Sequence, residues 1–242
     1  MGGQKCPPFF IKLGFIKTHK NLRYIDMNIT VTIPTSLSEI TLGQYKEYLK
    51  IQTSSKDERF LQAKMIEIFC NAPLEYVMEL KYSDTEEIVN ILDEMFKQKP
   101  DLVQRFKLGK LEFGFHPNLE DLSLGEYIDL DTYIGDWQNM ERAMNVLYRP
   151  IIAKLREKYE IEKYNSNLNE QILDMPMDAV LGSIFFLWNL GIELSQTMMK
   201  YLEGEQNLDL MQFLTSELNG DGIPAYMRSL KETLEDLNIS PN

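Results

Sequence analysis

A nine-residue segment that occurs twice constrains the fold of this chain more than any other feature of its sequence. Residues 37–45 read Leu-Ser-Glu-Ile-Thr-Leu-Gly-Gln-Tyr and residues 119–127 read Leu-Glu-Asp-Leu-Ser-Leu-Gly-Glu-Tyr, at an offset of 82. The two copies are identical or similar at every position except Ser38/Glu120. A repeat of this length that appears only twice does not indicate a solenoid array. It predicts one local structure that the chain uses twice.

Each copy has the pattern of a helix start. Thr41 precedes Gln44 by three residues in the first copy, and Ser123 precedes Glu126 in the second. This is the spacing of a capping box: the hydroxyl accepts a hydrogen bond from the backbone N–H of the third helical residue, whose side chain accepts one from the N–H of the cap. We therefore predict capped helices that begin directly after Thr41 and Ser123.

The residues around each cap favour the same geometry. Apolar residues stand on both sides of the cap, at the positions of a hydrophobic staple. They are Ile40 and Tyr45 in the first copy, and Leu122 and Tyr127 in the second. Gly43 and Gly125 fall in the first helical turn, where a missing side chain would let another backbone approach.

Strand-like stretches precede both copies. Residues 28–33 alternate between polar and apolar and end at Pro34. Residues 105–115 alternate on both sides of Gly109-Lys110, which is typical of a hairpin with a two-residue turn. The predicted repeat unit is therefore a strand, a proline, an acidic turn and a capped helix.

Most of the remaining sequence has the apolar spacing of amphipathic helices. Helices are predicted at 56–70, 73–80, 83–95, 131–148, 176–202, 208–218 and 224–237. Ser83 and Glu86 have the spacing of a third capping box. Pro150 breaks or kinks the helix before it, with 151–158 as a candidate continuation and 159–164 as a short edge strand. We predict an α+β fold, mainly α, with one or two small β-hairpin or strand elements and a central helix over 176–202.

The charge distribution separates the first 26 residues from the rest. They carry a net charge of +4. Because the whole chain carries −12, the remaining 216 residues carry −16. Three interpretations stay open. The segment is a basic arm that contacts nucleic acid or an acidic partner, or it begins with a lipidation site, or it is an extension that precedes a true start at Met27. The last interpretation is favoured. We predict an N-terminal extension over 1–26, disordered or not native, and two helical subdomains over 27–104 and 105–242 that pack as one unit.

The composition excludes several classes of protein. A net charge of −12 disfavours nucleic-acid binding through the acidic body, because phosphate contacts need an excess of cations. Cys6 and Cys70 are too far apart for a Cys-x-x-Cys site, and the only histidines are His19 and His116. The most apolar run, 179–190, is shorter than the roughly 20 residues of a spanning helix, so no membrane partner is predicted.

Motifs of common enzymes are missing from the sequence. It contains no Gly-x-x-x-x-Gly-Lys-Ser/Thr, no Gly-x-Gly-x-x-Gly, no Gly-x-Ser-x-Gly and no His-Glu-x-x-His. The best acidic cluster comprises Asp121, Glu126, Asp129, Asp131 and Asp136. It could bind a divalent cation, but acidic residues also favour helix N-termini, which is the preferred interpretation. Arg149 is a candidate partner for this cluster, or else a charge at a helix C-terminus. We predict a non-enzyme without cofactor or metal.

Longer motifs around the second copy resemble those of a phage protein family. The motifs are Phe115-His-Pro-Asn-Leu-Glu-Asp-Leu-Ser-Leu-Gly-Glu-Tyr-Ile-Asp-Leu-Asp131, Tyr133-Ile134, Asp136-Trp137, Met140, Ala143-Met144, Val146-Leu-Tyr-Arg-Pro150, Met175-Pro-Met-Asp-Ala-Val180 and Phe185-Phe-Leu-Trp-Asn-Leu190. Over residues 28–204 the chain resembles proteins of tailed-bacteriophage morphogenesis modules, often described as tail assembly chaperones. Residues 1–26 do not belong to the pattern.

The resemblance implies a non-enzymatic helper of virion assembly. Such a protein would bind a tape-measure protein or tail subunits in the bacterial host cytoplasm and keep them soluble until the tail polymerises, with self-association open as a further interaction. The alternative is a structural virion component, such as a connector, neck or head-associated protein, and a metal-dependent enzyme is a distant third. The predicted partner-binding residues are His116, Asn118, Glu126, Asp129, Asp131, Trp137 and Arg149.

Overall fold

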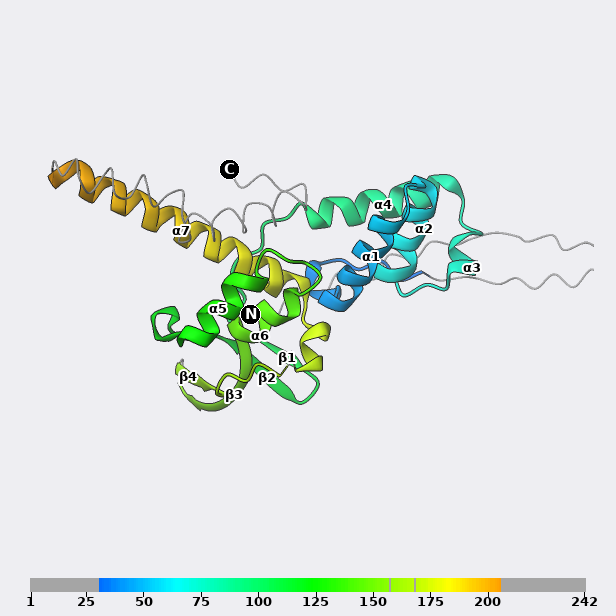
Figure 1. The fold of residues 1–242 in the computed structure, drawn as a ribbon. Helices are drawn as coiled ribbons and strands as arrows, with labels where there is room; N and C mark the ends of the chain where they lie inside the picture. Colours follow the sequence, from blue (N-terminus) through cyan, green and yellow to red (C-terminus); the bar gives the residue numbers. More distant parts are fainter. Residues whose placement is uncertain (1–30, 157, 168, 206–242) are drawn as a thin grey trace, which may run out of the picture. The chain divides into compact units, whose positions relative to one another are not determined.

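The computed structural model describes residues 31–156, 158–167 and 169–205, and it divides the chain into two compact units, 1–98 and 99–242 (Figure 1). The described residues form seven α-helices and one four-stranded antiparallel sheet, which confirms the predicted α+β, mainly α class. The division falls after Gln98, six residues before the end of the first predicted subdomain at 104. The predicted extension 1–26 and the predicted helices 208–218 and 224–237 lie outside the described residues.

The described part of the first unit is helical. A 3-10 turn, Leu37–Glu39, leads into α1 (Leu42–Ser54), α2 (Glu58–Phe69), α3 (Leu74–Val77) and α4 (Tyr82–Phe96). Aromatic rings join these helices: Phe96 lies 5.4 Å from Tyr45 and 5.1 Å from Phe69, measured between ring centroids. Tilted pairs at such distances add to the stability that apolar burial supplies.

Two predictions for the first unit need correction. Val31 and Ile33 are buried and Thr32 is exposed, as the alternation predicted, but residues 31–33 are not paired in a strand, and the first half of the predicted strand, 28–30, lies outside the described residues. The third capping box does not form, because α4 begins at Tyr82 and Ser83 is therefore already helical. A cap must be non-helical to reach the third N–H. Ser83 donates instead to Asp84, at 3.1 Å.

The second unit combines the sheet with the remaining helices. Its strands are β1 (Arg105–Leu108), β2 (Leu111–Phe115), β3 (Tyr148–Leu155) and β4 (Lys158–Ile161), in the order β1-β2-β3-β4. Its helices are α5 (Leu124–Tyr133), α6 (Met140–Leu147) and α7 (Met177–Glu205), with 3-10 turns at Leu119–Asp121 and Glu170–Asp174. The hairpin at 105–115 is confirmed. Its turn begins at Gly109, whose φ of 56° suits a residue without a side chain.

The predicted helix 131–148 is confirmed only in part, and its predicted continuation over 151–158 is wrong, because residues 148–155 form a strand. α5 ends at Tyr133 and α6 covers only Met140–Leu147. Pro150 lacks the N–H that a helix needs and biases Arg149 towards extended backbone. Both residues therefore enter β3, where Pro150 pairs with Phe113 of β2. The predicted edge strand at 159–164 is confirmed over its first half as β4.

The first half of α7 is buried in the second unit, as its all-round apolar sequence predicted. Val180, Leu181 and Ile184 are buried, and a Cβ on Gly182 would lie 2.4 Å from the carbonyl oxygen of Asp101. By length and composition α7 is the one described helix that could cross a membrane, over Met177–Leu194. In this structure 56% of that window is buried, and a soluble core helix gives the same pattern.

Candidate functional site

The two repeat copies form the same local structure. In each copy a 3-10 turn precedes a helix, and the capping box is complete. Gln44 accepts from the backbone N–H of Thr41 at 2.9 Å, and Glu126 accepts from that of Ser123 at 2.8 Å. The predicted helix starts are therefore confirmed in both copies.

The third helical residue also ties each helix to a later part of its own unit. The Nε2 of Gln44 donates to the carbonyl of Ile68 at 2.6 Å. At the equivalent position, the Oε1 of Glu126 forms an ion pair with the Nη2 of Arg149 at 2.8 Å. The two copies thus use the same position with different chemistry, an amide donor in one and a carboxylate acceptor in the other.

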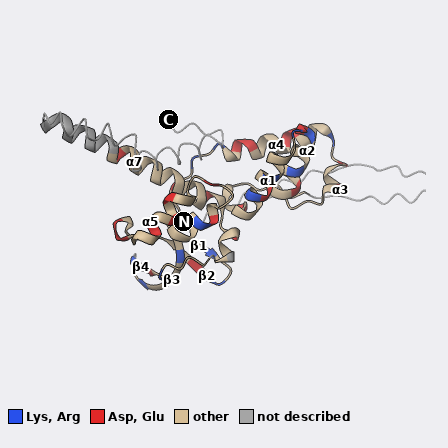
Figure 2. Ribbon diagram, viewed as in Figure 1, with Lys and Arg blue, Asp and Glu red and all other residues tan. Residues whose placement is uncertain are grey.

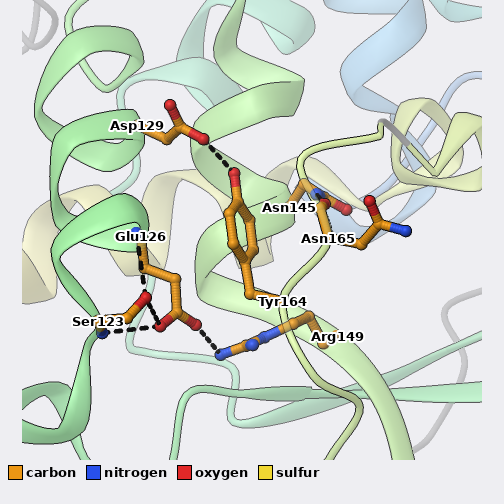
Figure 3. A network of polar contacts seen from close by, with 7 residues as sticks. All are labelled: Ser123, Glu126, Asp129, Asn145, Arg149, Tyr164 and Asn165. Atoms are coloured by element: carbon orange, nitrogen blue, oxygen red, sulfur yellow. Dashed lines mark hydrogen bonds and ion pairs between the residues drawn. The ribbon is translucent and has the colours of Figure 1, made fainter.

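The ion pair between Glu126 and Arg149 is buried (Figure 3). Each side chain is 8% exposed, and the Arg149 guanidinium also lies 5.9 Å from the centre of the Tyr164 ring. Burial alone would raise the pKa of Glu126, but the hydrogen bonds from Ser123 and the charge of Arg149 lower it overall. Burial lowers the pKa of Arg149, and Glu126 opposes that shift. An arginine stays protonated at neutral pH in either case, so both partners are charged. This pairing confirms Arg149 as a partner of the acidic cluster.

Further polar contacts extend from this ion pair. The Tyr164 hydroxyl donates to the carboxylate of Asp129, and the Nδ2 of Asn145 donates to the carbonyl of Asn165 at 3.0 Å (Figure 3). Burial and the bond to Asp129 raise the pKa of Tyr164, so its hydroxyl stays protonated and remains a donor. The contacts fix the inner side of α5 to β3 and to the segment 162–167.

The other predicted partner-binding residues separate into buried and exposed ones. His116 and Trp137 are buried, and burial together with the charge of Arg149 lowers the pKa of His116. Asn118 is exposed and caps the 3-10 turn before α5, accepting from the N–H of Glu120 at 3.2 Å. Asp131 is exposed on α5. The structure therefore does not bring all seven residues into one surface.

The acidic cluster does not converge on one point. Asp121 accepts from Asn118 at 2.9 Å, while Asp136 accepts from the N–H of Gln138 at 2.8 Å. Glu126 and Asp129 point to Arg149 and Tyr164, as described above. Within residues 31–156, 158–167 and 169–205, no three His, Cys, Asp or Glu side chains are placed to hold a metal ion.

Two hollows border this region of the second unit. One, of about 350 Å³, is lined by Asn145, Arg149, Pro150, Glu162, Lys163, Tyr164, Asn165, Asn167 and Asn169. Four of these nine residues are asparagines, so the lining offers hydrogen bonds to water or a small polar molecule. The other, of about 640 Å³, is lined by Leu102, Gln104, Phe115, His116, Pro117, Asn118, Leu119, Glu120, Lys158, Tyr159 and Phe186. Its apolar part is formed by Phe115 and Phe186, whose rings lie edge to face with their centroids 5.6 Å apart.

The side of α5 that faces away from the ion pair is apolar and exposed. Leu124 is 75% exposed, Tyr127 48% and Ile128 51%. Together with Asp131 they stand at positions i, i+3, i+4 and i+7, which is one face of a helix. We call these four residues the α5 outer face. Figure 2 colours the acidic residues of α5 red. Asp131 belongs to the α5 outer face, whereas Glu126 and Asp129 point to Arg149 and Tyr164 on the other side of the helix.

The equivalent face of the first copy is covered. Leu42, Tyr45 and Lys46 correspond to the three apolar residues of the α5 outer face, and all three are buried. Tyr45 packs on Phe96 of α4. This contrast does not follow from the repeat itself, because Tyr45 and Tyr127 fit the staple position equally well in both copies. The 3-4 spacing of apolar residues in α5 was the available signal.

The prediction that Gly125 admits a neighbouring backbone is wrong. A Cβ at Gly125 would have no atom within 4 Å, because the outer side of α5 is open. Close approaches occur instead at Gly182 and at Gly114, where a Cβ would lie 2.5 Å from the Tyr159 ring. Neither glycine belongs to the repeat.

Comparison of the chain with protein-family models, with curated proteins and with solved structures gives no significant match.

Proposed function

We propose that this chain is a non-enzymatic phage assembly protein, a tail assembly chaperone that binds tape-measure or tail subunits in the host cytoplasm. The observation that carries the proposal is the α5 outer face, which exposes Leu124, Tyr127 and Ile128 while the same positions of the first copy are covered. The sequence resemblance to phage morphogenesis proteins supplies the class of partner.

The chemistry of the α5 outer face suits a protein partner. An exposed leucine gains about 2 kcal/mol when it is fully buried, so three adjacent apolar side chains can hold an apolar helix. Recognition by a rigid helical face needs anchors at i, i+3 and i+4, which α5 provides. Because Glu126 is tied to Arg149 on the opposite side, the face keeps its orientation when no partner is bound.

Co-purification from infected cells tests the proposal. Leu124→Glu puts a charge on the face but suits the first helical turn, where acidic residues are favoured. We expect it to weaken binding of the tape-measure protein about 30-fold, in line with the loss of about 2 kcal/mol from one buried leucine, and to reduce its recovery accordingly. Leu155→Glu is the matched control, because Leu155 is 78% exposed on β3 of the same unit. Equal recovery with both variants would exclude the α5 outer face as the binding surface.

The alternative function, a structural virion component, predicts a different location. A chaperone is present in the lysate and missing from purified particles, whereas a connector or neck protein is retained in them. Mass spectrometry that finds the chain in mature virions at a fixed copy number would overturn the proposal in favour of this alternative.

A further inference from the structure

We propose that the cavity of about 640 Å³ at the end of β2 binds a tyrosine side chain of the partner protein. We call it the β2-end cavity, and all of its lining residues belong to the second unit. They include His116 and Asn118, two of the predicted partner-binding residues. The proposal rests on the proposed function, because it gives the same partner a second point of attachment.

The β2-end cavity has the size and the fixed walls of a ligand site. Ligand pockets in proteins measure roughly 300–1,000 Å³, and the cavity falls within that range. The Tyr159 hydroxyl donates to the carbonyl of Phe115 at 2.7 Å, and the backbone N–H of His116 donates to the carbonyl of Leu147 at 2.7 Å. These bonds hold the end of β2 in place before a ligand arrives. A ligand therefore loses little affinity to the ordering of the site.

The apolar part of the β2-end cavity favours an aromatic ring. Phe115 and Phe186 lie edge to face there, and Leu102 and Leu119 also line the cavity. Aromatic rings attract further rings in offset or edge-to-face arrangements, and this attraction adds to the gain from burying apolar area. We therefore expect a third ring to bind here more tightly than an aliphatic side chain of similar size.

One polar atom of the cavity lining lacks a partner. His116 is 9% exposed, and within the part of the chain that the structure describes its Nδ1 forms no hydrogen bond. Burial and the charge of Arg149 lower the pKa of His116, so the imidazole is neutral at pH 7. In a neutral imidazole Nδ1 either donates or accepts, depending on which ring nitrogen carries the proton. A phenolic hydroxyl both donates and accepts, so it can pair with Nδ1 in either case.

The charge of the lining favours a neutral ligand. Lys158 and Glu120 are exposed, so the cavity opens to solvent between charges of opposite sign that cancel. The side chain of Asn118 is already used, since it donates to Asp121 and accepts from the N–H of Glu120. Tyrosine is neutral at pH 7 and fits this lining. Phenylalanine is neutral as well, but it would leave the Nδ1 of His116 unpaired, which costs free energy.

Titration of the full chain with p-cresol, which is the tyrosine side chain without its backbone, tests the chemistry of the site. By chemical-shift titration we expect a Kd of about 1 mM, as for a small ligand in a preformed pocket. Nuclear Overhauser contacts should join its ring to Phe115 or Phe186. Toluene lacks the hydroxyl and should bind about tenfold more weakly, because it leaves His116 unpaired. Equal binding of the two probes, or no binding of p-cresol at about 10 mM, overturns the proposal.

Two variants alter the β2-end cavity. His116→Leu should abolish the preference for p-cresol over toluene and lower the recovery of the tape-measure protein about tenfold. Phe186→Ala removes a half-buried ring and should weaken p-cresol binding about tenfold, which keeps the test decisive if His116→Leu does not fold. Leu155→Glu is the matched control on β3 and should change neither quantity. Unchanged circular dichroism shows that each variant remains folded.

Co-purification separates this proposal from the proposed function. If p-cresol binds as expected but His116→Leu and Phe186→Ala leave the recovery of the tape-measure protein unchanged, the cavity takes a free phenol and its assignment to the partner is overturned. If p-cresol does not bind while Leu124→Glu still loses the tape-measure protein, the proposed function stands and the tyrosine site is wrong. If the cavity variants lose the tape-measure protein and Leu124→Glu retains it, the tyrosine site stands and the α5 outer face is not the binding surface.

Discussion

Replacing Arg149 by methionine would leave the Glu126 carboxylate buried without its cation. Methionine keeps much of the length of the arginine stem, so the change removes charge more than volume. At 2.8 Å and an effective dielectric constant of about 20, the attraction between the two charges is about 6 kcal/mol. Desolvation of both groups offsets much of this attraction. The loss in free energy of unfolding is therefore estimated from the cost of leaving one charged group buried without its partner.

Removing one member of a buried ion pair typically costs 3–5 kcal/mol, and we expect about 3 kcal/mol here. The lower end applies because the carboxylate keeps two hydrogen bonds from Ser123, from the N–H at 2.8 Å and from the hydroxyl at 2.6 Å. Glu126→Gln should cost a similar amount by stranding Arg149. The double variant should cost less than the sum of the two by about 2 kcal/mol, because it leaves no unpaired charge.

Urea unfolding followed by tryptophan fluorescence measures these losses. Both tryptophans of the chain, Trp137 and Trp188, belong to the second unit, so the signal reports that unit. A loss of about 3 kcal/mol in a unit of this size lowers the thermal midpoint by about 10 °C.

Lys154→Met is the matched control, since Lys154 lies on the same strand and pairs with Glu112 in a more exposed position. It should cost less than about 1 kcal/mol. A cost of Arg149→Met no greater than that of the control, or losses at Arg149 and Glu126 that simply add, would show that the buried ion pair does not stabilise the second unit as described.

Three further predictions concern the second unit and the helix starts. Gly182→Ala should cost about 2 kcal/mol in the same urea assay, because the new Cβ would lie 2.4 Å from the carbonyl oxygen of Asp101. This oxygen belongs to the backbone and cannot move aside as a flexible side chain would. An unchanged urea midpoint would contradict the contact. The pKa of His116 is lowered in the folded chain, so the unfolded state takes up the proton first as the pH falls below about 6.5. The contribution of His116 to the free energy of unfolding is fully present above that pH. It is lost as the pH falls through the lowered pKa that His116 has in the folded chain. His116→Gln should therefore lose less stability than the wild type between about pH 7.5 and about pH 5.5, and equal losses would show that His116 is not the group responsible. Ser123→Ala should cost about 1 kcal/mol by removing a cap, whereas Ser83→Ala should change stability by less than about 0.5 kcal/mol, as measured by circular dichroism during urea unfolding; similar costs would contradict the assignment of caps.

Local patterns in the sequence predicted those elements that depend on neighbouring residues. The capping boxes at Thr41 and Ser123 need only residues three positions apart, and the hairpin at Gly109 needs only a turn and alternation. Both are confirmed, because the interactions that specify them lie within a few residues. The long helix after Pro176 was predictable for the same reason, since its apolar residues are continuous.

Features that depend on distant residues were predicted only in part. The segment after Leu147 has apolar residues that suit a helix or a strand, and its pairing with β2 decides between them. Charge suggested Arg149 as a partner of the acidic cluster, but nothing in the polar stretch around Tyr164 indicated that its hydroxyl reaches Asp129. Such contacts become visible only when the fold has placed segments that are far apart in sequence.

The two repeat copies separate what the motif specifies from what its surroundings specify. The motif determines the cap and the helix start, and these are the same in both copies. The polarity of the side chains at one outer position is the reverse of what their exposure predicts. The buried position of the first copy carries Lys46, whereas the exposed equivalent in the second copy carries Ile128. Exposed positions of a free helix usually carry charged residues, and buried ones rarely do. Solvent exposure alone therefore does not account for Ile128, whereas the proposed binding of a partner at the α5 outer face would.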